Sequence, residues 1–236
     1  KRAYNFNADP SALPLEVLEV AQKELLDFQN TGMSVMELSH RSATFEAVHN
    51  GAIELLRKIY NIPENYEVLF LQGGASLQFT MIPMNFLSEG KTASYVQTGA
   101  WSEKAFKEAK FFGTPVEAAS TKENKYKNIP SQEDIKFNAD DAYVHITSNN
   151  TIFGTQWKVF PDTGDVPLVA DMSSDILSKP VDVSKFGIIY AGAQKNLGPS
   201  GVTVVIIRKD LLEKANTNIP TMLKYSTHAA NNSLYN

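Results

Sequence analysis

The feature that most constrains this chain is an alternation of short apolar runs with amphipathic stretches between residues 66 and 208. Runs that are apolar on both faces are typical of parallel strands that helices cover on both sides. With 236 residues, 43% of them hydrophobic, the chain can bury such a core. The runs interpreted as strands are residues 67–72, 93–98, 115–119, 142–147, 167–172, 187–192 and 202–208. The sequence therefore predicts an α/β fold built on these seven strands.

The connection between the last two runs departs from this alternation. Only about ten residues join them, whereas a crossover between parallel strands needs roughly a dozen or more. We therefore predict a mostly parallel seven-stranded sheet with one antiparallel strand.

Helical spacing of apolar residues marks the other stretches. Pro14 opens a predicted helix over residues 14–29, whose apolar positions are Leu15, Leu18, Leu25 and Leu26. Further helices are predicted over residues 44–60, 76–87 and 101–112. The expected buried stripe of the helix over 44–60 consists of Phe45, Val48, Leu55, Leu56 and Ile59.

Composition argues against several classes of function. A net charge of −4 argues against a general nucleic-acid binder, because such proteins carry dense Lys and Arg. The chain has no cysteine, so we expect no thiolate metal site and no disulfide framework. No apolar run approaches the roughly 18 residues of a membrane span. The polar start lacks a signal-peptide core, so we expect a cytoplasmic protein without a membrane partner.

Unusual residues follow four of the predicted strands. Gly73, Gly74, Ala75 and Ser76 follow the first, and residues 148–151 follow the fourth. Asp171 ends the fifth strand, and Lys195 comes shortly after the sixth. Since ligands bind beyond the carboxyl ends of parallel strands, these residues mark one candidate site.

The glycine-rich turn after the first strand is a candidate phosphate site. Glycines allow close approach, and the free N–H groups of a helix start favour an anion. The turn lacks the Lys-Ser/Thr pair of a Walker loop. The alternative is an ordinary strand-to-helix turn capped by Ser76.

Asp171 and Lys195 add two further chemical groups. A carboxylate at the end of a buried strand needs a donor or a cation, although it could simply cap the next turn. A lysine amine without its proton forms a Schiff base with an aldehyde, although most lysines are surface residues. A phosphate cradle, an aspartate for a ring nitrogen and an amine together are what a pyridoxal 5'-phosphate enzyme needs. Trp101 could stack on the ring, or pack in the core.

The sequence resembles the phosphoserine aminotransferase family, a class V group of the type I aminotransferase fold, over essentially its whole length. The matching stretches include TGMSVMELSHRS, VLFLQGGASLQF, TGAWSEKA, FPDTGDVPLVADMSSDILSKPVDVSKFG, IYAGAQKNLGPSG and HAANNSLYN. Residues 1–236 would then be the pyridoxal-phosphate-binding large domain, N-terminal segment included, with the small C-terminal domain of the family absent.

The resemblance implies a role for each matching residue. Lys195 would form the Schiff base and act as proton carrier, and Asp171 would pair with the pyridine nitrogen. The other implied cofactor-binding residues are Ala75, Ser76 and Gln194 at the phosphate, Trp101 on the ring, Thr151 at the ring hydroxyl, and Asn236. His40 and Arg41 would meet the distal anion of the substrate.

The implied reaction moves an amino group between L-glutamate and 3-phosphohydroxypyruvate, giving O-phospho-L-serine and 2-oxoglutarate, in serine and pyridoxine biosynthesis. The implied assembly is a homodimer in which Asn236 begins a segment donated to the partner. Family members are longer, and their C-terminal arginines hold the substrate α-carboxylate. We therefore expect this chain by itself to be weakly active or inactive.

Two alternatives stay open. The chain could belong to another class V aminotransferase, such as an alanine–glyoxylate or serine enzyme; an active cysteine desulfurase is excluded because there is no cysteine. It could also be a non-catalytic, dimer-forming fragment. A nucleotide-phosphate binder would leave Lys195 and Asp171 unexplained.

Overall fold

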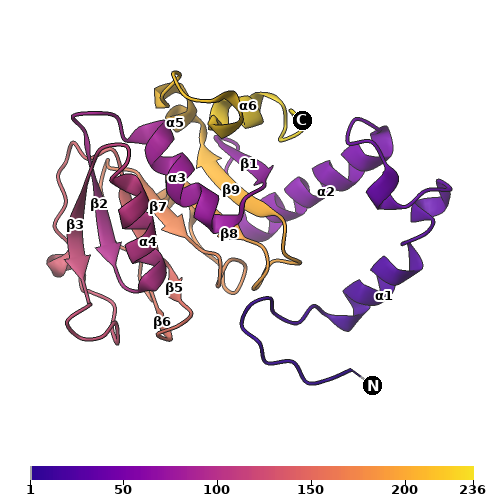
Figure 1. Ribbon diagram of the computed structural model, residues 1–236, viewed down its shortest axis with the longest axis horizontal. Coiled ribbons are helices and arrows are strands. Elements are labelled where there is room, and N and C mark those ends of the chain that lie inside the picture. Colours follow the sequence, from indigo (N-terminus) through magenta and orange to yellow (C-terminus); the bar gives the residue numbers. More distant parts are fainter. Residues whose placement is uncertain (1) are drawn as a thin grey trace.

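The computed structural model describes residues 2–236, which form a twisted sheet with helices on both faces (Figure 1). The helices are α1 (Leu15–Lys23), α2 (Ala43–Tyr60), α3 (Gly74–Phe86), α4 (Ala100–Ala109), α5 (Lys209–Lys214) and α6 (Tyr225–Ala230). The strands of the main sheet are β1 (Tyr66–Leu71), β2 (Thr92–Gln97), β3 (Thr114–Ser120), β4 (Val144–Thr147), β7 (Leu168–Asp171), β8 (Ile188–Gly192) and β9 (Thr203–Arg208). A small hairpin consists of β5 (Asn149–Asn150) and β6 (Thr155–Gln156).

The order of the seven-stranded sheet is β1-β9-β8-β7-β4-β2-β3. Strand β9 runs antiparallel to both neighbours, β1 and β8, and every other pair is parallel. The prediction of a mostly parallel sheet with one antiparallel strand is therefore confirmed. The short connection of residues 193–202 places β9 antiparallel beside β8, as its length required.

Each face of the sheet carries its own apolar core. Alternate strand residues, such as Val144 and Ile146, pack with α2 residues Leu56 and Tyr60 on one face. The opposite face packs against α3 and α4, which lie side by side over it in Figure 1. Burial on both faces explains why the strands are apolar throughout.

The predicted buried stripe of α2 is largely wrong. Only Leu56 of the five expected residues is buried; Phe45 is half-buried, while Val48, Leu55 and Ile59 are exposed by 41%, 59% and 59%. The helix instead buries His49, Leu56 and Tyr60. Helical periodicity predicted an amphipathic helix correctly, but the sheet covers only one edge of the apolar face.

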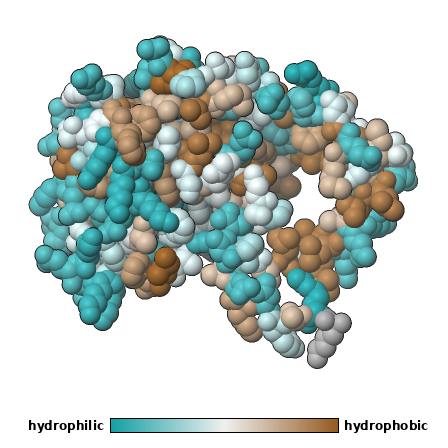
Figure 2. Space-filling model, in the orientation of Figure 1, coloured by the Kyte–Doolittle hydropathy of each residue, from teal (hydrophilic) through white to brown (hydrophobic). Residues whose placement is uncertain are grey.

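Helix α1 is shorter than the predicted 14–29 and has no buried residue. The four predicted apolar positions are all exposed: Leu15 and Leu18 in α1, and Leu25 and Leu26 beyond its end. The helix lies away from the sheet in Figure 1, and hydrophobic side chains gather on this projecting part in Figure 2. An isolated helix of this length is marginal in water, so its apolar face calls for a packing partner.

Helices α5 and α6 and the β5–β6 hairpin were not predicted. Among residues 2–236, no helix has both the length and the apolar character that a membrane crossing requires.

Candidate active site

A cavity of about 120 Å³ opens at the carboxyl ends of β4, β7 and β8. All the predicted cofactor residues other than Asn236 line it: Ala75, Ser76, Trp101, Thr151, Asp171, Gln194 and Lys195. Its remaining lining residues are Asp9, Gly74, Thr147, Asn149, Ser173 and Ser174. The fold thus brings residues from position 9 to position 195 around one small space.

The start of α3 forms one end of this cavity. Gly73 and Gly74 have φ angles of 89° and 66°, in the region that favours glycine. The first helical bond runs from Leu77 N–H to the Gly73 carbonyl at 3.2 Å, so the N–H groups of residues 74–76 are the orphan donors of a helix start. These donors and the helix dipole favour an anion.

The end of β8 approaches α3 closely. A Cβ atom added to Gly192 would lie 3.0 Å from Gln194 Oε1 and 3.7 Å from the Ala75 nitrogen. A side chain at position 192 would therefore crowd the space between Gln194 and the helix start. The absence of a Cβ leaves room for a small anionic group there.

Asp171 is the most buried charged group of the cavity, with 5% of its surface exposed. Burial raises the pKa of its carboxyl, while the Ser173 hydrogen bonds and the positive charge of Lys195 act in the opposite direction. Its Oδ1 accepts the Ser173 N–H at 2.9 Å. A buried carboxylate in this state gains from a cationic partner inside the cavity.

Lys195 faces the same cavity without pairing with Asp171. Its Nζ donates to Thr151 Oγ1 at 2.5 Å, and no ion pair among residues 2–236 includes Lys195. The Lys195 amine and the Asp171 carboxylate therefore line one cavity from separate positions. This is the arrangement that a ring held between them would need.

Thr147 supplies an unpaired polar atom in the same wall. Its position on β4 pairs with Asp171 on β7, and its Oγ1 is buried without a hydrogen-bond partner among the described residues. Buried hydroxyls are almost always bonded. This orphan oxygen indicates a polar group that the cavity is built to receive.

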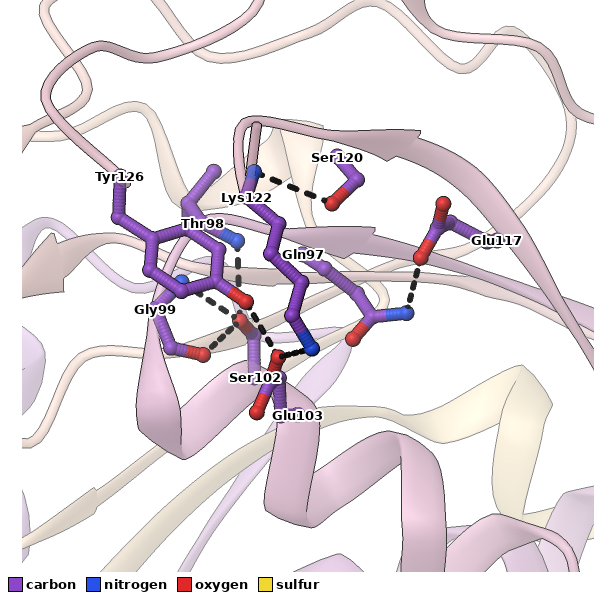
Figure 3. A network of polar contacts seen from close by, with 9 residues as sticks. All are labelled: Gln97, Thr98, Gly99, Ser102, Glu103, Glu117, Ser120, Lys122 and Tyr126. Atoms are coloured by element: carbon purple, nitrogen blue, oxygen red, sulfur yellow. Dashed lines mark hydrogen bonds and ion pairs between the residues drawn. The ribbon is translucent and has the colours of Figure 1, made fainter. Parts of the chain in front are cut away.

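Trp101 lies in the first turn of α4 and lines the cavity. A network of polar contacts stabilises this turn (Figure 3). Ser102 Oγ accepts the N–H groups of Thr98 at 2.9 Å and Gly99 at 3.1 Å. On the next residue, Glu103 pairs with Lys122 at 2.8 Å and accepts the Tyr126 hydroxyl. Bonds from Lys122 and Tyr126 lower the pKa of Glu103, so this carboxylate stays ionised and the turn stays fixed.

The N-terminal segment around Asp9 and Ser11, which lies in no helix or strand, closes another side of the cavity. The Ser11 N–H donates to the Gln194 carbonyl at 3.0 Å, and its hydroxyl contacts the Lys195 carbonyl. Asp9 thereby reaches the cavity wall. The sequence prediction missed Asp9 because nothing local indicates a contact across about 185 positions, whereas Thr147, Asn149, Ser173 and Ser174 flank predicted strand ends.

The remaining predicted residues lie outside this cavity. Arg41 is exposed on the loop between α1 and α2, and His40 is half-buried with its Nε2 unpaired among the described residues. Asn236 lines a different cavity of about 230 Å³ beside His228 and Tyr235. Their functional roles remain predictions. The described residues also contain no group of three or more His, Cys, Asp or Glu side chains that could hold a metal ion.

A family model and several known proteins match this chain over nearly its whole length. The family model described as "Aminotransferase class-V" matches residues 3–232. A curated phosphoserine aminotransferase of Lysinibacillus sphaericus (strain C3-41) is 78% identical over 236 residues, covering 100% of this chain and 65% of that protein. The Bacillus subtilis (strain 168) phosphoserine aminotransferase is 62% identical over 238 residues, with the same coverage of each.

Solved structures are equally similar. The phosphoserine aminotransferase from Bacillus circulans subsp. alkalophilus superposes with a TM-score of 0.97 at 60% identity, covering 100% of this chain and 65% of that one. The phosphoserine aminotransferase from Trichomonas vaginalis, described as bound to PLP, gives 0.91 at 42% identity, covering 100% and 66%. The chain thus spans about 65% of the length of the curated relatives that it matches.

Proposed function

Since the chain belongs to the class V aminotransferase family, we propose that it forms the cofactor-binding part of a phosphoserine aminotransferase. The enzyme transfers an amino group between L-glutamate and 3-phosphohydroxypyruvate, giving O-phospho-L-serine and 2-oxoglutarate. The observation that carries this proposal is that Lys195 and Asp171 face one cavity beside the start of α3 without pairing with each other. The 78% identity to a phosphoserine aminotransferase supports this choice of substrates.

The residues of the cavity fit pyridoxal 5'-phosphate. This cofactor supplies an aldehyde for amine exchange and a ring that withdraws electrons from the substrate carbon. The orphan N–H groups at the start of α3 and the Gln194 amide suit its phosphate. Buried Asp171 and the unpaired Thr147 hydroxyl suit polar positions on the ring.

Each residue of the cavity then has a distinct task. Lys195 would hold the cofactor through its amine, and the same amine would carry the proton at the substrate α-carbon. Asp171 keeps the ring nitrogen protonated, since its buried carboxylate gains from a positive partner. Ala75, Ser76 and Gln194 bind the phosphate, Trp101 stacks on the ring, and Thr151 binds at the ring hydroxyl.

The active protein is a homodimer in this proposal. An apolar groove of about 520 Å³ lies between α2 and the β8–β9 connection, and exposed Val48, Leu55 and Ile59 are among the residues that line it. Exposed apolar side chains gathered in one groove favour a protein interface. His40 and Arg41 serve the distal anion of the substrate, and in the dimer Asn236 serves the partner's cofactor phosphate.

Residues 1–236 form the large domain in this proposal, and a smaller domain supplies the arginines for the substrate α-carboxylate. The chain by itself is then weakly active, because losing that clamp costs several kcal/mol of positioning. We place the enzyme in the cytoplasm and in serine biosynthesis, with a role in pyridoxine biosynthesis as well.

A panel of amino donors tests the substrate assignment. The full-length protein is loaded with pyridoxal 5'-phosphate and offered glutamate with 3-phosphohydroxypyruvate, or alanine with glyoxylate. Phosphoserine formation from glutamate, at a rate well above that of glycine formation from alanine, is the expected result. A preference for alanine would assign the chain to another class V aminotransferase, and loading without any turnover would indicate a non-catalytic role.

A further inference from the structure

Asn150 connects two walls of the cavity without lining it. Its side chain is only 2% exposed, and both ends of its amide are bonded. Oδ1 accepts the Thr98 hydroxyl at 3.1 Å, and Nδ2 donates to Thr155 Oγ1 at 3.1 Å. The first bond reaches the turn before α4, and the second closes the β5–β6 hairpin. Asn150 thus ties the hairpin to a segment about 50 positions earlier in the chain.

The turn before α4 is shaped to receive this side chain. A Cβ atom added to Gly99 would lie 2.8 Å from Asn150 Oδ1 and 3.2 Å from Phe153 Cδ2. The hairpin therefore lies directly against the backbone of residue 99, where a larger residue would push it away. Ser102 holds the same turn from the other side through two N–H groups, as Figure 3 shows.

The backbone of Asn150 also shapes the hairpin tip. Its carbonyl accepts the N–H groups of Phe153 at 3.1 Å and Gly154 at 2.8 Å. Thr151 lies within this tip, and its hydroxyl accepts the Lys195 amine at 2.5 Å. The position of the Thr151 hydroxyl relative to the amine therefore depends on where Asn150 places the tip.

We propose that Asn150 is a positioning residue that holds Thr151 against Lys195 across the cavity. This inference rests on the proposed function, in which Lys195 binds the cofactor and Thr151 contacts its ring. The residue touches neither group itself; it acts through the place that it gives to Thr151.

The hairpin has other anchors that do not involve Asn150. Asn149 Nδ2 donates to Ser174 Oγ at 2.8 Å, and Gln156 Nε2 donates to Asp175 Oδ2 at 2.9 Å. These bonds fix the hairpin to the segment after β7. Removing the Asn150 amide should therefore leave the hairpin folded but let its tip shift relative to the α4 turn and the Lys195 amine.

A double-mutant cycle in the full-length protein tests this inference. The variants are Asn150→Ala, Thr151→Ala and the double variant. Asn124→Ala is the matched control, because Asn124 is exposed and its side chain bonds only to Asn128 among the described residues. The readouts are the dissociation constant for pyridoxal 5'-phosphate, from absorbance titration, and the melting temperature of the cofactor-free protein. We expect Asn150→Ala to weaken binding about five- to thirtyfold.

The background of Thr151→Ala separates positioning from general destabilisation. If Asn150 acts through Thr151, adding Asn150→Ala to the Thr151→Ala variant should change the affinity for pyridoxal 5'-phosphate by less than about twofold. The two effects are then not additive. An equal loss in both backgrounds, or wild-type affinity in Asn150→Ala, would overturn the inference. If Asn150→Ala does not fold, Thr155→Val removes the acceptor of the Asn150 amide more gently, and the same comparison applies to it.

Failure of the proposed function itself gives a different result. The wild-type protein would then show no saturable absorbance change with pyridoxal 5'-phosphate, and no variant could be ranked against it. If the wild-type protein binds the cofactor saturably and Asn150→Ala binds it with the same affinity, only the role of Asn150 is contradicted.

Discussion

The carboxyl edge of the sheet and the N-terminal arm, defined as residues 12–42, use their side chains in opposite ways. At the sheet edge, polar groups are buried and almost all are bonded within the chain; Asp171, Ser148 and Asn150 are examples. In the arm, α1 buries no residue, and apolar side chains such as Leu26 are 85% exposed. The sheet edge is held together by its own polar contacts, whereas the arm leaves its apolar side chains uncovered by the described residues.

The largest expected effect comes from Lys195→Ala at the sheet edge. The substitution removes the amine but touches none of the apolar core, so folding should be preserved while transamination falls about 10³-fold or more. The measurement is turnover of the full-length enzyme with glutamate and 3-phosphohydroxypyruvate. Lys185→Ala, an exposed lysine outside the cavity, should keep wild-type turnover. Comparable losses in both variants would contradict the role of Lys195.

Asp171→Asn should have opposite effects on cofactor binding and on the stability of the cofactor-free protein. Loss of the carboxylate should weaken pyridoxal 5'-phosphate binding about 100-fold, since the ring nitrogen loses its buried partner. The cofactor-free protein should gain roughly 1 kcal/mol of stability at pH 7, because a buried charge is removed. Absorbance titration and urea unfolding measure the two effects. Exposed Asp140→Asn is the control and should change neither.

The pH dependence of that stability carries a definite sign. Burial raises the folded-state pKa of Asp171 above the unfolded value of about 3.9, so the folded state binds the proton more tightly. The carboxyl therefore favours folding at low pH, and this contribution is lost as pH rises through the raised pKa. Unfolding of cofactor-free wild type and Asp171→Asn from pH 3.5 to 8 measures it. Curves that stay parallel across this range would refute the assignment.

Ile59→Glu probes another apolar surface that the described residues leave uncovered, the groove beside α2. Because Ile59 is 59% exposed, a charge there should cost the monomer less than about 0.5 kcal/mol, but it should split a dimer that covers this groove. Light scattering after size separation gives the mass in solution. Lys58→Glu introduces the same side chain next to the groove, and should leave the mass unchanged. A monomeric wild-type protein would show that another segment or partner covers this face.

The smallest effect is expected from Asp9→Asn, in the segment that precedes the arm and lines the cavity. Asp9 is an exposed carboxylate in the wall of a cavity that we assign to an anionic cofactor. Neutralising it should tighten pyridoxal 5'-phosphate binding about two- to fivefold at low salt, and by less at high salt. Unchanged or weaker binding would show that the carboxylate does not act by charge repulsion.

The strands of the sheet and most residues of the cavity could be predicted from the sequence, because buried strands and their ends leave local signals. Buried strands read as continuous apolar runs, and the residues after them, Asp171 and Lys195 among them, meet at one edge. The β5–β6 hairpin left no such signal, since each of its strands has two residues. Contacts such as that of Ser11 with Lys195 form only in the folded chain, so no local sequence pattern predicts them.

The same reasoning explains the failure at α2. Periodicity reports that a helix has an apolar face, but it does not report which surface covers that face. Leu56 is buried against the sheet, whereas Leu55 and Ile59 stay exposed in an apolar groove that the described residues leave open. Prediction therefore succeeded where the chain buries its own apolar residues and failed where the described residues leave an apolar face uncovered.

Borohydride reduction followed by peptide mapping tests the central claim most directly. The full-length protein is incubated with pyridoxal 5'-phosphate, reduced, digested and analysed by mass spectrometry. The account predicts one stoichiometric phosphopyridoxyl modification on Lys195, with the chain's other lysines, such as Lys185 and Lys122, left largely unmodified. Modification spread over surface lysines, or concentrated on a lysine other than Lys195, would contradict it.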